Sequence, residues 1–447
     1  MLGGFDWVTM EPGAHLMANR FLGVSSGGVD WEPQPPSPLE SLTVVGYRFS
    51  PRCHETRDFL VRNCVPFDWL DIERDEEARR LMIAAGLKSS ELPLVQLSDG
   101  TKLVQPTNAE IAQSIGLRVR PEKTSYDLVI VGGGPAGLAA AVNGASEGLR
   151  SIMIERQAPG GQAGLSSMIE NYLGFPSGLS GADLARRAVA QARKFEVEIV
   201  TPQAVTGLRA NGPSRFVKLN DGLELQCEVV LLAGGVEWRR LDVPGVERLT
   251  GAGVYYGGTL AEAVFCRNED VFIVGGANSA GQAALYFSRY ARTVTMLVRG
   301  NSLSKSMSQY LVDQIGATKN IQVRLRTTVV ELHGSDRLEA ITILDAATDK
   351  KQKLAANALF IFIGANPHTE YLEGAVERDR HGFILTGHDI TVRALERDPY
   401  WLESSIPGVF AAGDVRHGSV KRVAAAVGEG AAAVQFVHQY LNSVVSG

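Results

Sequence analysis

The sequence predicts an α/β protein with three folded parts, and three observations lead to this prediction. The chain has 447 residues, enough for about three domains of ordinary size. Two segments, with glycine-rich turns that begin at Gly132 and Gly275, each run strand, turn, helix, strand. A shorter stretch before them, from Leu42 to Leu117, alternates strand-like and helix-like runs. We therefore expect one small α/β domain followed by two larger units of the same general kind.

The composition is that of a folded chain without a large charged surface. Apolar residues make up 45% and charged residues 21%, which excludes wholesale disorder. The net charge is −5, so we expect no nucleic-acid partner. No apolar run reaches the roughly 18 residues of a membrane span, and no secretory signal begins the chain. We expect a cytoplasmic protein with no membrane partner.

The beginning of the chain divides into a tail and a domain. Residues 1–40 show no sustained period and end in a proline-rich run, so a flexible tail or linker is expected there. The small α/β domain is expected over residues 41–119. The histidines show no HxH or HExxH spacing, and no metal is expected.

The first glycine turn has the pattern of a dinucleotide-binding fingerprint. Gly132, Gly134 and Gly137 follow a strand of buried type and precede an alanine-rich helix, and the next strand ends at Glu155. The first glycine permits a tight turn, the second a close approach of backbone to pyrophosphate, and the third close packing of helix on strand. Glu155 can accept hydrogen bonds from a ribose. Neighbouring residues expected at the same site are Pro135, Ala136 and Arg156.

The C-terminal segment IPGVFAAGDVRHGSVKRVAAAVGEG places Asp414 after an apolar strand and before a small-residue helix. Together with the first fingerprint, this pattern resembles the pyridine nucleotide-disulfide oxidoreductase superfamily, most closely the low-molecular-weight thioredoxin reductases, from about Tyr126 to Leu441. The resemblance implies bound FAD, with Asp414 bonded to the ribityl chain. It also implies flavin contacts in the run APGGQAGLSSMIEN and around the aspartate. These residues are Gly161, Gln162, Asn171, Gly413, Lys421, Arg422 and Val423.

The second glycine turn resembles the nicotinamide-binding turn of the same family. Its middle glycine is replaced by Ala277, whose methyl group would push against a close pyrophosphate. Arg299 follows the second strand where NAD-specific sites carry an acid, and a cation there favours NADPH over NADH. A degenerate domain that binds neither nucleotide is the alternative. The expected site residues are Gly275, Ala277, Asn278, Ser279, Ala280 and Arg299.

The redox dithiol of thioredoxin reductases has no counterpart in this sequence. The family carries CxxC just before the second fingerprint, and the corresponding positions here are expected to be Gly257 and Leu260. Cys266 stands further along, near the end of an expected helix. Reduced flavin would therefore need another outlet for its electrons.

The N-terminal domain resembles glutaredoxins over about residues 42–117, which implies a thioredoxin fold. Cys53 is expected to be a nucleophile at a helix start, where the helix dipole and Arg52 would favour the thiolate. Thr56 replaces the second cysteine, and Pro93 is placed like the cis-proline of the family. The resemblance also puts Thr107 and Asn108 near a glutathione carboxylate. An inert docking module is the alternative, and Cys64 and Cys227 are expected to be core residues.

The resemblance implies a discontinuous FAD-binding domain, residues 124–241 and 368–447, interrupted by an NAD(P)H-binding domain over 242–367. It also suggests a homodimer. Three functions remain open. The first is an NAD(P)H-dependent thiol–disulfide oxidoreductase that acts through Cys53 on a small thiol or a disulfide protein. The second is an electron transferase to a quinone, ferredoxin or oxygen, and the third is a non-catalytic flavin-binding sensor.

Overall fold

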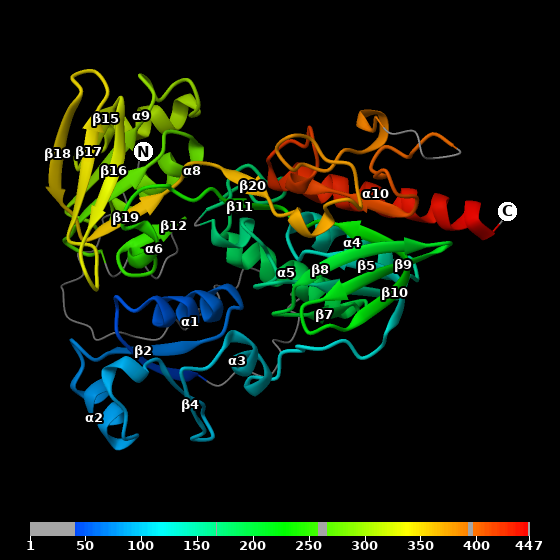
Figure 1. Ribbon diagram of the computed structural model, residues 1–447, viewed down its shortest axis with the longest axis horizontal. Coiled ribbons are helices and arrows are strands. Elements are labelled where there is room, and N and C mark those ends of the chain that lie inside the picture. The colour runs from blue at the N-terminus through cyan, green and yellow to red at the C-terminus, as the bar shows by residue number, and fades with distance from the viewer. Residues whose placement is uncertain (1–40, 167, 258–265, 392–396, 446–447) are drawn as a thin grey trace, which may run out of the picture.

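The computed structural model describes residues 41–166, 168–257, 266–391 and 397–445. The expected tail, residues 1–40, and Leu260 lie outside the described residues. The described chain forms three bodies, shown in Figure 1: an N-terminal body in blue, a body of mainly green and yellow strands, and a body that combines cyan and green elements with the red C-terminal helix. The described part contains no helix that is both long and apolar enough to span a membrane.

The N-terminal module, defined here as residues 41–117, is a four-stranded sheet with three α-helices. The strand order is β2-β1-β3-β4; β1 and β2 are parallel and the other pairs are antiparallel. Its peptide bond between Leu92 and Pro93 is cis, as the resemblance to glutaredoxins implied. The elements are β1 (Leu42–Gly46), α1 (Pro51–Arg62), β2 (Phe67–Asp71), α2 (Glu76–Ala84), η1 (Ser89–Glu91), β3 (Leu94–Gln96), β4 (Lys102–Val104) and α3 (Asn108–Ser114).

Helix α1 begins where its sequence predicts. The hydroxyl oxygen of Ser50 accepts a hydrogen bond from the Cys53 amide, and Pro51 occupies the first turn, where it leaves no amide unpaired. Phe59 and Leu60 face the sheet and are buried in one apolar cluster with Val44. The alternation of strand and helix in this stretch is therefore explained by two apolar faces around one sheet.

A larger region, formed by both ends of the remaining chain, carries the first glycine turn. Strands β7, β6, β5 and β10 are parallel neighbours, and β21, from near the C-terminus, pairs with the end of β10 in the same direction. Strands β9 and β8 continue the sheet in antiparallel fashion. Its strands are β5 (Ser125–Val131), β6 (Ser151–Ile154), β7 (Glu198–Val200), β8 (Val205–Asn211), β9 (Ser214–Leu219), β10 (Glu224–Leu232) and β21 (Val409–Ala411).

The helices of this region pack closely because small residues line them. A Cβ atom added to Gly430 of α10 would lie 2.1 Å from the carbonyl oxygen of Ala136 in α4, so only glycine allows this approach. Buried alanines and Leu138 fill the rest of the layer. The helices are α4 (Pro135–Ser146), η2 (Ala163–Leu165), α5 (Gly181–Lys194), η3 (Glu370–Leu372), η4 (Gly387–Asp389), η5 (Gly413–Val415) and α10 (Val423–Val445).

The region with the second glycine turn is a five-stranded parallel sheet with a three-stranded antiparallel sheet beside it. The parallel order is β12-β19-β13-β14-β15, and the antiparallel order is β16-β17-β18. Its elements are α6 (Val246–Leu249), β12 (Val254–Tyr256), β13 (Asp270–Val274), α8 (Asn278–Phe287), β14 (Thr293–Val298), α9 (Gln309–Ala317), β15 (Ile321–Leu325), β16 (Thr327–His333), β17 (Ala340–Asp345), β18 (Lys350–Ala355) and β19 (Ala358–Ile361).

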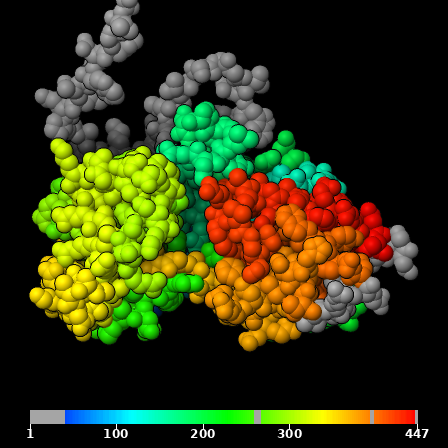
Figure 2. All heavy atoms as spheres, turned by 90° about the horizontal axis from the view of Figure 1, so that it is seen from above, coloured from blue at the N-terminus to red at the C-terminus, as the bar shows by residue number. Residues whose placement is uncertain are grey.

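A two-stranded ribbon joins the two larger regions. It pairs β11 (Val236–Trp238) with β20 (Ala365–Pro367) in antiparallel fashion, so the chain crosses and returns at the same place. Figure 2 shows the two regions as separate lobes, yellow-green and orange-red, with a furrow between them. The return crossing is what brings Asp414 back to the sheet that holds the first glycine turn.

Candidate dinucleotide-binding sites

The first glycine turn forms a backbone cradle at the carboxyl end of β5. Gly132 has φ +106°, and a Cβ there would lie 2.4 Å from the carbonyl oxygen of Ala233. A Cβ on Gly137 would lie 1.9 Å from the Gly132 carbonyl oxygen. By contrast, no described protein atom lies within 4 Å of a Cβ built on Gly134, at the start of α4. Two glycines are thus required by the protein itself, while the third leaves room for a ligand at a helix N-terminus.

Glu155 is held at the edge of this cradle. It follows β6, and its two carboxylate oxygens accept from the amides of Gly133 at 2.6 Å and Gln157 at 2.8 Å. This places a carboxylate beside the turn, and its role as a ribose partner stays a prediction. The guanidinium of Arg156 instead forms an ion pair with Glu237 on the ribbon strand β11.

The segment that contains Gly161 and Gln162 folds back onto the turn. The Gly160 amide donates to the Gly133 carbonyl at 2.7 Å, and a Cβ on Gly161 would lie 3.1 Å from the Cα of Gly134. The side-chain amide of Gln162 donates to the Val236 carbonyl at 2.8 Å. The structure therefore brings Gly161 and Gln162 to the cradle, whereas Asn171 lies on the surface.

Asp414 also reaches the cradle, from the other end of the sequence. Gly413 follows β21 with φ +77°, and a Cβ there would lie 2.9 Å from the Cβ of Ala136 in α4. Burial raises the pKa of the Asp414 carboxyl and lowers the pKa of the Lys421 ammonium. The Lys421 ammonium donates to the Asp414 carbonyl oxygen, and Val423 begins α10, directly after the exposed Arg422.

Sequence reasoning missed the carboxylate that holds this turn. Glu429 of α10 is buried and accepts from the Gly413 amide at 2.7 Å, the Ser419 hydroxyl at 2.9 Å and the Arg416 guanidinium at 2.8 Å. An acid isolated in a helix of alanine, glycine and valine was the available signal, since a buried charge needs such partners. Glu429 positions the segment that carries Asp414.

The second glycine turn repeats the construction at the end of β13. Gly275 has φ +146°, and a Cβ there would lie 2.5 Å from the carbonyl oxygen of Phe362. Ala280 is fully buried where the helix packs on the sheet. Ala277, Asn278 and Ser279 are exposed at the start of α8. The predicted binding residues therefore line an accessible helix N-terminus.

A neighbouring segment completes this second site. The side-chain oxygen of Asn278 accepts from the Ser308 amide at 2.7 Å, and the Ser306 hydroxyl donates to the Gly276 carbonyl at 2.7 Å. Arg299, directly after β14, and Lys305 are both exposed. Lys305 directly precedes Ser306, which bonds to the turn, and both cations are open to a phosphate group.

Cys53 differs from the prediction. It is the third residue of α1, fully buried, and its sulfur accepts from the Tyr47 amide at 3.5 Å. Burial raises the pKa of the thiol, so the expectation of a stabilised thiolate is wrong. Arg52 points elsewhere and donates to Gln105 at 2.6 Å. The Cys53 amide, in the first turn of the helix, donates to the hydroxyl oxygen of Ser50.

The other cysteines do not form a redox pair in the described chain, where all four thiols are free. Cys64 is exposed, so its prediction as a core residue is wrong. Cys227 is buried as predicted, and burial raises its pKa to about 12. Cys266 lies in the apolar core with residues of β13. Gly257, one of the two positions expected to replace the dithiol, packs near Trp238: a Cβ on it would lie 3.4 Å from the indole nitrogen.

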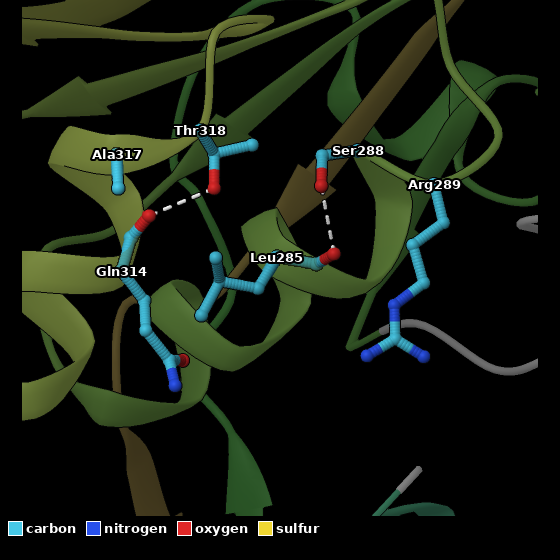
Figure 3. Close-up of a pocket in the computed structure, with 6 residues that line it drawn as sticks. All are labelled: Leu285, Ser288, Arg289, Gln314, Ala317 and Thr318. Carbon is cyan, nitrogen blue, oxygen red and sulfur yellow. Dashed lines mark hydrogen bonds between the residues drawn. The ribbon is translucent and has the colours of Figure 1, made fainter. Parts of the chain in front are cut away.

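A separate pocket of about 400 Å³ lies at the far end of α8 from the glycine turn (Figure 3). Ser288 and Thr318 bond back to the carbonyl oxygens of Leu285 and Gln314, closing their own helix ends. The pocket therefore lies between the C-terminal ends of α8 and α9 and is not part of the nucleotide site. Its lining residues are Leu285, Ser288, Arg289, Gln314, Ala317 and Thr318.

Comparisons with known proteins match about 70% of the chain. Residues 126–430 match the family described as pyridine nucleotide-disulphide oxidoreductase. Thioredoxin reductase of Mycolicibacterium smegmatis is 32% identical over 311 residues, covering 70% of this chain and 95% of the relative. Thioredoxin reductase of Treponema pallidum (strain Nichols) is 32% identical over 322 residues, covering 72% and 99%.

Solved structures give the same result. The Lactococcus lactis thioredoxin reductase (FR conformation) superimposes with a TM-score of 0.65 at 28% identity, covering 71% of this chain and 99% of that one. The T. acidophilum thioredoxin reductase superimposes with a TM-score of 0.64 at 26% identity, covering 72% and 100%. Both matches leave part of the chain uncovered.

Proposed function

The chain belongs to the pyridine nucleotide-disulphide oxidoreductase family, and from this premise we propose that it reduces an external disulfide with electrons from NADPH. It is an FAD-dependent oxidoreductase of thioredoxin reductase type, with FAD and NADPH as cofactors. The proposed overall reaction is NADPH + H⁺ + RSSR → NADP⁺ + 2 RSH. The observation that carries the proposal is the pair of open backbone cradles at Gly134 and Ala277, on two sheets linked by one ribbon.

The first cradle suits FAD. Gly134 leaves space at the N-terminus of α4, where amide groups and the helix dipole favour a pyrophosphate. Glu155 offers carboxylate oxygens to a ribose, and Asp414 offers a second carboxylate directly after Gly413, which packs against α4. When bound, FAD supplies an isoalloxazine ring that accepts two electrons from NADPH. The residues of the chain bind and orient it, and Glu429 keeps Asp414 in place.

The proposed layout has four parts. A tail covers residues 1–40, and a glutaredoxin-like domain of thioredoxin fold covers 41–119. The FAD-binding domain covers 124–241 and 368–447, with the NAD(P)H-binding domain over 242–367. The strand order β2-β1-β3-β4 and the cis peptide at Pro93 support the thioredoxin fold. We also propose a cytoplasmic homodimer, on the resemblance to the family alone.

The burial of Cys53 bears on how the electrons leave. Thiol–disulfide exchange needs an accessible thiolate, and the sulfur of Cys53 is enclosed in the core of the module with Val45 and Leu94. We therefore propose that the disulfide reacts at the flavin region without passing through Cys53. A non-disulfide acceptor, such as a quinone, ferredoxin or oxygen, is the second candidate, because the sequence contains no CxxC pair.

Anaerobic titration tests both candidates. NADPH should bleach the bound flavin, and glutathione disulfide or a disulfide protein should then restore its colour in wild type and in Cys53→Ser alike. Cys64→Ser, which removes an exposed thiol, is the matched control. Recovery with a quinone or ferredoxin but with no disulfide would refute disulfide reduction in favour of the second candidate. Loss of recovery in Cys53→Ser alone would restore the route through that thiol.

A further inference from the structure

The start of helix α1 in the N-terminal module is covered by the region that holds the second glycine turn. Both terminal nitrogens of Arg48 donate to the two carboxylate oxygens of Glu269, each at 3.0 Å. The side chains are only 6% and 21% exposed. A bidentate, largely buried ion pair fixes both the distance and the orientation of its partners.

Close packing surrounds this ion pair. The His54 and Tyr255 rings lie 5.0 Å apart between centroids. A Cβ on Gly251 would lie 2.9 Å from the Cα of Pro51, so the two backbones approach as closely as glycine allows. The Arg337 guanidinium also lies 5.3 Å from the centroid of the Phe49 ring. The surface around the start of α1 is therefore packed closely against the region that holds the second glycine turn.

The other end of α1 contacts the region that holds the first glycine turn. The Arg62 guanidinium donates to the Gln157 side chain at 3.1 Å, and the Asn63 side chain donates to the Gln157 carbonyl at 3.3 Å. Gln157 in turn donates its amide to Glu155 at the cradle. One helix of twelve residues, about 18 Å long, thus touches both nucleotide-binding regions, as Figure 1 shows for α1 beside α6 and α5.

The covalent connection between the two nucleotide-binding regions is short. Their connection is the ribbon of β11 and β20, three residues in each strand. Regions joined in this way are expected to move relative to one another unless a large interface prevents it. A third body fixed to both would restrict that movement.

We propose that the N-terminal module is a brace that holds the two nucleotide-binding regions in one relative orientation, with Arg48 and Glu269 as its latch. The surface at the start of α1 then serves an intramolecular partner, the described residues Gly251, Tyr255 and Glu269. Opening the latch frees the region of the second glycine turn to move on the ribbon. The module acts through docking and not through its thiol.

Charge reversal on the full-length chain tests the brace, and it needs no substrate. Glu269→Arg should speed amide hydrogen exchange at least tenfold in peptides that cover residues 51–54 and 251–256. The same variant should widen the distance distribution in small-angle X-ray scattering. Arg48→Glu should do the same, and the double reversal should restore wild-type behaviour. The matched control reverses Glu76 and Arg80, an ion pair of the module that is 74% and 73% exposed and should change neither measurement.

Exchange within the module separates undocking from unfolding. Peptides of β2 and α3 should stay protected in Glu269→Arg, which lies outside the module. Wild-type exchange at the junction in both single variants would overturn the latch. Faster exchange at the junction with an unchanged scattering profile would overturn the brace, because the junction would then not be what holds the two regions together.

Discussion

The most direct test of the flavin cradle is the substitution Gly134→Ala. Gly134 has φ −71° and ψ −177°, a conformation that alanine adopts without strain. No described protein atom lies within 4 Å of the added Cβ. The new methyl group can therefore collide only with a ligand, and a loss of FAD affinity would report on the cofactor site alone.

The two effects on the variant can be estimated separately. In the apo protein, alanine gains about 0.4–1 kcal/mol by restricting the unfolded chain and loses a comparable amount, about 0.5–1 kcal/mol, as a poorer N-cap. The free energy of unfolding should then change by less than about 1 kcal/mol. If the methyl group displaces one amide hydrogen bond to the pyrophosphate, worth about 1.5–3 kcal/mol, the dissociation constant of FAD should rise about 10- to 150-fold.

Apo protein reconstituted with FAD gives both quantities, by urea denaturation and by titration of flavin fluorescence. Gly137→Ala is the control, because its Cβ would lie 1.9 Å from the Gly132 carbonyl oxygen and should destabilise the apo protein as well. If Gly134→Ala binds FAD within twofold of wild type, the cradle has been assigned to the wrong ligand. An apo protein destabilised as much as Gly137→Ala would show that the space at Gly134 is not open.

Three further predictions follow from the same sites. Glu429→Ala should lower the unfolding free energy of apo protein by about 3–5 kcal/mol, because Arg416 stays buried without its partner. The control is Glu147→Ala, which removes a partly exposed pair with His438 of α10 and should lower the unfolding free energy by about 1 kcal/mol or less. Equal losses of unfolding free energy for the two variants in urea denaturation would contradict the role of Glu429. Asp414→Asn should raise the unfolding free energy of apo protein at neutral pH, because burial raises the pKa of the aspartate and penalises its charged form. This stabilisation should vanish as pH falls below about 3.9, where the unfolded aspartate is also protonated. A difference in unfolding free energy that does not change with pH would refute it. Ala277→Gly should lower the KM for NADPH with kcat unchanged, since it removes an exposed methyl group beside the expected pyrophosphate, and an unchanged KM would place the nucleotide elsewhere.

The sequence predicted the two cradles because backbone geometry determines their residues. Gly132 and Gly275 both have positive φ and no room for a side chain, so glycine at these positions carries direct structural information. The strands before them are continuous apolar runs, which is typical of buried parallel strands. Spacing and hydrophobicity alone were therefore sufficient to locate both turns and the helices that follow.

The chemistry of Cys53 could not be read in the same way. A cysteine in the first turn of a helix can face solvent or the core, and the two orientations differ by only a residue or two along the helix. Ser50 is the N-cap, so Cys53 comes at the third helical position and turns toward Val45. The partners of Glu429 were equally hidden, since Arg416 and Gly413 reach it only through the packing of η5 against α10.

The burial of Cys53 and the docking of α1 support one interpretation of the N-terminal module. A thiol catalyst of this kind needs a helix start that is both reactive and open to a partner. In this chain the sulfur is enclosed, and the surface beside it is occupied by Tyr255, Gly251 and Glu269. Either change alone would impair thiol exchange, and the second also ties the module to a region that a short ribbon would otherwise leave free to move. The N-terminal module is thus better explained as a structural partner of the two nucleotide-binding regions than as an electron acceptor.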